Sequence, residues 1–417
     1  MEYLKKESIL GNKSHNDVEN TVKTIIENVK KKGDSAVQEY ERKFGNSDRQ
    51  VRVSDKEIED CHNILPKDTK LLIDRIVDRV SEFAKAQMEC ISPFEKDFGE
   101  GIRMGHRVVP IENVGAYIPG GRFPLLSSGP MVVAPAKVAG AKRIIACSPA
   151  NYQGGIHPAV LYGLVRSGAT DIFAIGGAQA IAAMAYGTES VPEVDIISGP
   201  GNMFVAEAKR QVFGKVGIDL IAGPSEVMVF ADEHASPNKI AADLLAQAEH
   251  DPYARAILVT TSREIATSTL KEIENILLTF SAASPAHESW ESRGEIIYVE
   301  SLQEGLSVCN DYAIEHLHLH VRNSKELTSK LYNYGSLFIG EDSSVVFSDK
   351  VSGTNHTLPT QKAARYTGGL WVGSYLKILT HQEITGPGIQ YLASHAEQQS
   401  DIEGLEGHKL SATVRMG

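Results

Sequence analysis

Four short stretches of the chain carry the residue types that could do chemistry. They hold Gln247 and His250, the pair Glu315 and His316, the polar segment 349–356, and His408 near the C-terminus. Together they supply imidazoles, a carboxylate and an amide oxygen that could close around one divalent metal ion, and they leave a Glu-His pair for proton transfer. The sequence therefore predicts a metalloenzyme.

The first stretch ends a predicted helix. Ser236 and Pro237 have the pattern of an N-cap followed by proline in the first turn, and apolar residues then recur with helical period until an Asp-Pro pair stops them. Gln247 and His250 lie three residues apart on one face of the last turn, a usual way to present two ligands. A C-terminal cap is the alternative role for His250, because an imidazolium stabilises the negative end of a helix dipole.

Asp349 and His356 lie in a segment rich in residues that favour turns and side-chain hydrogen bonds. The apolar run 335–340 precedes it and is typical of a strand that delivers a loop to a site. A solvated connection between two elements has the same composition. The combination of the four stretches, and no single one of them, indicates a site.

The composition limits the partners. The chain has 417 residues, 42% hydrophobic and 23% charged, which is enough for two or three lobes. A formal net charge of -11 repels nucleic acid and anionic membranes, so neither is an expected partner. No apolar run reaches the roughly 18 residues of a membrane helix, and the N-terminus lacks a signal-peptide core. The 4 cysteines show no paired spacing, which favours a cytoplasmic protein without disulfides.

Hydrophobic periodicity predicts an α/β protein. The first hundred residues have helical stripes, whereas from 107 to 232 short apolar runs alternate with Ala-rich helical stretches, as in βαβ units. A similar alternation resumes at 256–260. We therefore expect two nucleotide-binding-like (Rossmann-like) lobes with parallel sheets, plus small N- and C-terminal helical extensions. The expected division is a discontinuous first lobe (1–116 with 233–370), a second lobe on the cofactor side (117–232) and a C-terminal extension (371–417).

The chain has no Gly-x-Gly-x-x-Gly fingerprint, so dinucleotide binding cannot rest on the usual glycine loop. Gly176 and Gly177 instead follow a predicted strand and open a helix, whose backbone amides could meet a phosphate. A tight turn that needs glycine for its backbone angles explains these residues equally well.

Seven motifs are spread over nearly the whole chain. They are Tyr117-Ile-Pro-Gly-Gly121, Gly176-Gly-Ala-Gln-Ala-Ile181, Gly199-Pro-Gly-Asn202, Ala222-Gly-Pro-Ser-Glu226, Gln247-Ala-Glu-His250, Glu315-His-Leu317 and Gly353-Thr-Asn-His-Thr-Leu-Pro-Thr360. In order and spacing they resemble the motifs of histidinol dehydrogenases. The resemblance implies a zinc- and NAD-dependent enzyme that oxidises a primary alcohol to a carboxylate through an aldehyde, with two NAD per turnover.

The resemblance also implies a role for each matched residue. One zinc ion per chain would be bound by Gln247, His250, Asp349 and His408, and NAD by Tyr117, Gln179 and Asn202. The expected substrate contacts are Ser127, Ser225, His356 and Glu403, with Lys350 as a further one. A homodimer is implied as well, in which His408 crosses to the partner's zinc site and the active sites are shared.

The implied chemistry rests on Glu315 and His316. Zinc polarises the alcohol oxygen, His316 takes the alcohol proton while hydride leaves to NAD, and Glu315 activates the water that attacks the aldehyde. A solvated surface pair is the alternative. On period two, His316, His318 and His320 share one face, as in a His-rich strand. Only His316 is predicted to be catalytic, because it alone lies in the matched motif.

Departures from the family pattern lie at positions that are expected to recognise the substrate. Val345 and Lys350 stand where the family has a Glu and a Tyr, His318 replaces an acidic residue, and Arg122 adds a cation. Each lost charge contact with the cationic histidinol is worth about 1.5 to 3 kcal/mol. A small anionic alcohol is therefore favoured, and relatives that oxidise 2,3-dihydroxypropane-1-sulfonate look similar. Histidinol is the alternative substrate, because Glu403 matches the family's ammonium contact.

Two other classes of protein are compatible with these residues. A zinc hydrolase would use Glu315 beside a metal-bound water, and a non-catalytic binding protein would keep the scaffold without turnover. Formation of NADH from alcohol and NAD separates the dehydrogenase from both.

Overall fold

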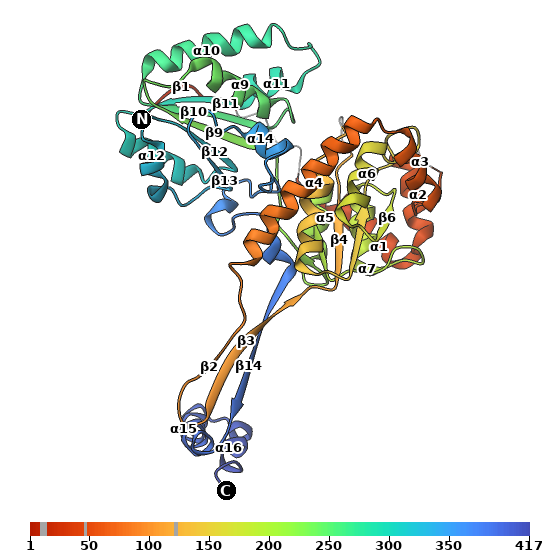
Figure 1. Ribbon diagram of the computed structural model, residues 1–417, viewed down its shortest axis with the longest axis vertical. Coiled ribbons are helices and arrows are strands. Elements are labelled where there is room, and N and C mark those ends of the chain that lie inside the picture. Colours follow the sequence, from red (N-terminus) through yellow and green to blue (C-terminus); the bar gives the residue numbers. More distant parts are fainter. Residues whose placement is uncertain (9–14, 46–47, 121–123) are drawn as a thin grey trace.

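The computed structural model describes residues 1–8, 15–45, 48–120 and 124–417 (Figure 1). Two α/β lobes lie side by side, and a long narrow arm extends away from them and ends in two helices. Gly121, the last residue of the first motif, and Arg122, the added cation, fall outside the described residues. None of the helices in the described ranges is both long enough and apolar enough to cross a bilayer.

One lobe is built on a five-stranded parallel sheet with the order β6-β5-β4-β7-β8. Numbered from β4 along the chain, this order is 3-2-1-4-5, which is that of a nucleotide-binding fold. The strands are β4 (Asn113–Tyr117), β5 (Arg143–Cys147), β6 (Asp171–Phe173), β7 (Ile196–Ser198) and β8 (Gly217–Ile218). The connecting helices are α5 (Ser128–Ala139), α6 (Pro158–Ser167), α7 (Gly177–Tyr186) and α8 (Met203–Val212). Strands β4 and β5 contribute buried side chains to two hydrophobic clusters.

The other lobe is built on a six-stranded sheet with the order β1-β11-β10-β9-β12-β13, in which β1 pairs antiparallel and the rest are parallel. Without β1 the order is again 3-2-1-4-5, so the two sheets share one topology. The strands are β1 (Glu2–Lys5), β9 (Glu226–Ala231), β10 (Arg255–Thr260), β11 (Gly294–Tyr298), β12 (His316–His320) and β13 (Ser336–Ile339). The helices are α9 (Pro237–Ala248), α10 (Arg263–Leu277), α11 (Pro285–Arg293), α12 (Leu302–Tyr312), α13 (Ser324–Leu327) and α14 (Val345–Lys350). The mixed α/β fold with parallel sheets is thereby confirmed.

Four N-terminal helices belong to a different lobe from the one expected. They are α1 (His15–Lys32), α2 (Asp34–Phe44), α3 (Asp55–Ile64) and α4 (Lys67–Met88). Helix α1 packs on α7 and α8, and α4 packs on α5 and α6. Their assignment to the lobe of residues 233–370 was therefore wrong. The apolar stripe of α1 predicts a buried face, but it does not say which surface covers that face. Strand β9 likewise lies in the six-stranded sheet, although residues 117–232 were assigned to the second lobe.

The arm is a three-stranded antiparallel sheet that carries a helical tip. Strands β2 (Phe94–Asp97), β3 (Ile102–Pro110) and β14 (Leu376–Ile384) lie in the order β14-β3-β2. Helices α15 (Pro387–Glu403) and α16 (Glu406–Thr413) pack on each other beyond it. The short 3-10 helices η1 (Thr328–Lys330), η2 (Ala363–Arg365) and η3 (Val372–Tyr375) complete the chain. Ile402 and Leu410 on the tip are 83% and 64% exposed, which is unusual for large apolar side chains.

Candidate functional site

The candidate site lies at the amino edge of the six-stranded sheet. Strands β9 and β12 are neighbours, and Glu226 and His316 begin them, with Glu315 directly before β12. Because β9 and β10 run parallel, the helix α9 between them must return the chain to this edge. The end of α9 therefore brings Gln247, and His250 just beyond the helix, to the same place. The N-cap expected at Ser236 is in position, with Pro237 first in the helix.

Two of the four predicted metal ligands come together here, and a third, Gln247, lies three residues before one of them. His250 Nε2 lies 3.8 Å from Asp349 Oδ2. The Gln247 side chain is 1% exposed, and its Oε1 finds no hydrogen-bond partner among the described residues. Leaving a buried oxygen unsatisfied costs about 1 to 3 kcal/mol, a cost that a bound cation would remove. An imidazole, a carboxylate and an orphaned amide oxygen form a donor set that fits a divalent metal ion.

Asp349 was expected on a loop but lies in the helix α14. Ser344 caps this helix, since its Oγ accepts a hydrogen bond from the Val346 amide. The buried Val345 packs this short helix onto the lobe and so fixes the carboxylate beside His250. The turn-forming residues, from which a loop was expected, begin only after this helix.

Glu226 holds both members of the predicted catalytic pair through its backbone. Its amide donates to Glu315 Oε2 at 2.8 Å, and its carbonyl oxygen lies 3.0 Å from His316 Nδ1. A carbonyl only accepts, so Nδ1 carries the ring proton and Nε2 keeps a free lone pair. His316 is 2% exposed, and its Nε2 has no partner in the part of the chain that is described. When the ring is neutral, Nε2 is therefore the nitrogen that accepts a proton.

Charges around the pair shift its protonation. Burial lowers the pKa of His316, but the Glu315 carboxylate and the charge of Asp349 outweigh it and raise this pKa to about 9. Burial also raises the pKa of Glu226 to about 7, with Arg255 opposing and Glu315 adding to the rise. The site is therefore rich in negative charge, which favours a bound cation.

A loop after α14 joins the two lobes at this site. Asn355 Nδ2 donates to the Met131 carbonyl in α5 of the other lobe at 2.7 Å. His356 follows, and its Nε2 is buried without a partner among the residues described. Burial lowers the pKa of His356, against the charges of Asp349 and Glu315, which places its ring within their electrostatic reach. The predicted substrate contact thus faces the same group of residues.

The remaining predicted substrate residues are distributed over four places. Lys350 is exposed and directly follows Asp349. Ser225 precedes β9, and Ser127 is the N-cap of α5, one turn before Met131. Glu403 lies on the arm tip, where its carboxylate accepts a hydrogen bond from Gln399.

His408 is the predicted ligand that the single chain does not bring to the site. It lies in α16, at the far end of the arm, and is exposed (Figure 1). Glu403 shares this location. Within one chain these two residues cannot reach Gln247 and His250.

The predicted NAD contacts lie at the carboxyl edge of the five-stranded sheet. Tyr117 ends β4, and Asn202 caps α8 after β7, so both lie where the strand order reverses, the usual place for a dinucleotide. Asn202 Oδ1 accepts from two amides of the first turn of α8. The three assignments stay predictions.

The phosphate site expected at Gly176 and Gly177 is occupied by the protein itself. The Gly176 amide donates to Glu41 Oε1 at 3.0 Å, and the Gly177 amide donates to the Tyr117 hydroxyl at 3.0 Å. Gln179 Nε2 also donates to Glu41 Oε1, at 2.9 Å. A buried carboxylate thus takes the positive helix end, which favours the alternative of a tight turn over a phosphate cradle at these amides.

Sequence reasoning missed one buried cluster, Asp243 with His318 and His320. A ligand atom can be chosen from each so that all lie within 4.8 Å of one another. The period-two histidines were visible in the sequence, but the carboxylate comes from α9, some 75 residues earlier. Asp243 lies four residues before Gln247 on the same helix face, and this spacing was the sequence feature that could have indicated the cluster.

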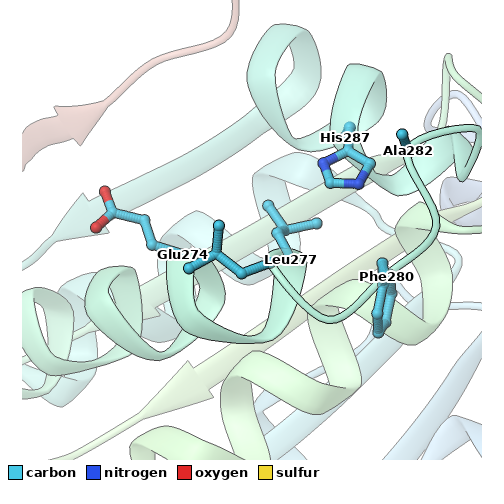
Figure 2. Close-up of a pocket in the computed structure, with 6 residues that line it drawn as sticks. Glu274, Leu277, Phe280, Ala282 and His287 are labelled. Atoms are coloured by element: carbon cyan, nitrogen blue, oxygen red, sulfur yellow. The ribbon is translucent and has the colours of Figure 1, made fainter.

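A separate pocket lies where α10 ends and α11 begins (Figure 2). Its lining is mainly apolar and consists of Glu274, Leu277, Leu278, Phe280, Ala282 and His287. It contains none of the predicted site residues, so we do not assign the chemistry to it.

Comparison with known proteins agrees with this geometry. A model of the histidinol dehydrogenase family matches residues 10–416. The chain is 44% identical to a histidinol dehydrogenase homolog of Shouchella clausii, over 97% of this chain and 95% of that protein. It is 38% identical to the sulfopropanediol 3-dehydrogenase of Ruegeria pomeroyi, over 100% and 96%. The crystal structure of histidinol dehydrogenase from Elizabethkingia anophelis superimposes with a TM-score of 0.92 at 36% identity, covering 99% of this chain and 94% of that one.

Fold and site together define an NAD-dependent oxidoreductase that acts on a CH–OH group through two oxidation steps. The chain belongs to the histidinol dehydrogenase family. The family is metal-binding, which agrees with the donor set at the amino edge of the six-stranded sheet.

Proposed function

We propose that this enzyme oxidises a small anionic primary alcohol, such as 2,3-dihydroxypropane-1-sulfonate, to the carboxylate. The observation that carries the proposal is Lys350, an exposed cation directly after the metal-site Asp349. It forms no ion pair with any residue in the described ranges, so its ammonium is available to an anion. The buried, uncharged Val345 at the start of α14 offers nothing to a cationic substrate. The 38% identity to a sulfopropanediol 3-dehydrogenase supports the same choice.

Lys350→Met will test the substrate class. We expect kcat/KM for dihydroxypropanesulfonate to fall about 10- to 100-fold, the value of one lost charge-assisted contact of about 1.5 to 3 kcal/mol. NADH formation from the neutral analogue glycerol should change by less than about threefold, which makes glycerol the matched control. Lys377→Met on the arm is the control variant, because this lysine is exposed and lies away from α14.

Histidinol is the second candidate substrate. Glu403 is retained, and several relatives carry the name histidinol dehydrogenase. A higher kcat/KM for histidinol than for the sulfonate would replace our proposal with this one.

We further propose that the metal is zinc, held by Gln247, His250, Asp349 and the His408 of a second subunit. The orphaned Gln247 Oε1 and the convergent imidazole and carboxylate support this assignment. When bound, zinc supplies a Lewis acid that lowers the pKa of an alcohol, and NAD supplies the hydride acceptor. The positive charge also offsets Asp349, one of the charges that raise the pKa of His316. This offset lowers the pKa of His316 and so increases the fraction of neutral imidazole that can act as a base.

The proton transfers follow from the hydrogen bonds of the pair. His316 Nε2 accepts the alcohol proton, because Nδ1–H is held by the Glu226 carbonyl. Glu315, oriented by the Glu226 amide, takes a proton from the water whose oxygen adds to the aldehyde carbon. The hydrate so formed gives up the second hydride and leaves as the carboxylate. His356, whose Nε2 has no partner among the described residues, would hold the substrate during both steps.

Glu315→Gln should separate the two oxidations. We expect the rate of aldehyde oxidation to fall about 100- to 10,000-fold, because the water has lost its base, and alcohol oxidation to fall by less than tenfold. Single-turnover NADH formation from each substrate measures the two rates in the same protein. Equal losses with alcohol and aldehyde would contradict the assignment of Glu315 to the second step.

A further inference from the structure

A second cluster of metal-type ligands lies one helical turn before the predicted zinc ligands of α9. Asp243 is in α9, and His318 and His320 lie on one face of β12, with exposed fractions of 7%, 0% and 3%. These three residues are the buried triad. Asp243 is four residues before Gln247, and His318 is two residues after His316, so the triad lies beneath the candidate site and does not overlap it.

Two of the distances within the buried triad match those between ligands of one ion, and the ligand atoms of all three residues lie within 4.8 Å of one another. Asp243 Oδ2 lies 3.2 Å from His318 Nδ1 and 3.4 Å from His320 Nε2. Bonds of about 2.0 to 2.1 Å in a tetrahedral site place two ligand atoms about 3.3 Å apart. The same oxygen therefore faces both imidazoles at the separation that a shared ion requires.

Hydrogen bonding alone leaves the triad incomplete. His320 Nε2 is close to Asp243 Oδ2 but lacks the geometry of a hydrogen bond, and it has no other partner among the described residues. A metal ion lies along the nitrogen lone pair, not along a line from nitrogen to oxygen, so coordination accounts for a short contact of this kind. The other carboxylate oxygen, Oδ1, accepts a hydrogen bond from Ser344 Oγ at 2.6 Å. Such support is typical of a carboxylate that ligates a metal.

We propose that Asp243, His318 and His320 bind a second divalent transition-metal ion, separate from the one at the candidate active site. Two imidazoles and one carboxylate suit zinc and its neighbours in the first row. Because all three residues are buried, the ion has a structural role: it ties α9 and β12 together beneath the site, and Ser344 connects it to α14. Burial also lowers the pKa of His318, which keeps its imidazole in the neutral form that a metal needs.

Metal content per chain tests the proposal. Metal is removed from each protein with a chelator under mild conditions. The protein is then reloaded with Zn²⁺, desalted and analysed by elemental mass spectrometry. We expect two zinc ions per chain in the wild type, one in Asp349→Ala, one in His320→Gln and none in the double variant. His287→Gln is the matched control, since His287 also has an unpartnered Nε2 among the described residues but lies in the pocket at the start of α11 and is not a member of the triad, and it should keep both ions.

The outcomes distinguish this site from the proposed zinc at the active site. One ion in the wild type and none in Asp349→Ala would overturn the second site. One ion in both proteins, lost in His320→Gln, would support the triad and count against the catalytic zinc. If His320→Gln does not fold, the Asp349→Ala protein is titrated with Co²⁺, and visible absorption bands typical of cobalt–imidazole coordination should reach their maximum at one equivalent. Absence of these bands would overturn the proposal.

Discussion

Asp349→Ala will reduce alcohol oxidation roughly a thousand-fold or more and remove one metal ion per chain, while the protein stays folded. The carboxylate is one of the three ligands that we propose a single chain supplies, and it lies 3.8 Å from His250 Nε2. Its loss leaves a site too open to hold the ion tightly. Stability should change little, because Asp349 lies in the last turn of a six-residue helix, and the buried Val345 that anchors this helix is untouched.

Three measurements check this result: NADH formation, metal content and thermal unfolding. Asp342→Ala is the control, because Asp342 lies just before α14 and its side chain is 93% exposed in a surface ion pair. The control should keep its activity and its metal. Full turnover by metal-free Asp349→Ala protein would exclude a metal role for this carboxylate.

Mixing His250→Ala with His408→Ala will restore activity that neither variant has alone. His408 lies at the tip of the arm and does not reach the site of its own chain. If it completes the site of a partner, a hybrid dimer contains one site with both defects and one intact site. Random exchange makes about half of the dimers hybrid, so about a quarter of the wild-type activity should return.

The control mixture is His250→Ala with Asp349→Ala. Both residues lie on the same lobe, so each site of that hybrid keeps one defect, and no activity should return. Subunit exchange is verified by native mass spectrometry. If hybrids of the first pair form without any activity, His408 does not act across subunits, and the homodimer with shared sites loses its support.

Local patterns predicted the parts of the site that depend on local structure. The helix start at Ser236 and Pro237 and the strand within 335–340 are in place, because capping and apolar runs act over a few residues. Asp349 was placed on a loop, since the turn-forming residues after it hid a short helix.

Long-range packing was beyond the reach of these patterns. The carboxylate of Glu41 caps the turn at Gly176 from 135 residues away, and the sequence of neither segment predicts this contact. The same holds for Asp243 beside His318 and for the helices α1 to α4, whose stripes could be buried by either sheet. Motif resemblance supplied the ligand set, but it did not say that one ligand would stand at the end of an arm.

The arm also constrains how the chain can change length. Strands β3 and β14 pair without interruption from Leu376 opposite Pro110 to Ile384 opposite Ile102. Side chains alternate between the two faces of a strand, so one residue inserted into a single strand would turn every later side chain to the opposite face. Insertions can therefore be accommodated only when both strands lengthen together and by an even number. The distance that His408 can reach is thus fixed by the number of paired residues in the arm. Relatives with a longer arm must carry matched insertions at two places nearly 270 residues apart.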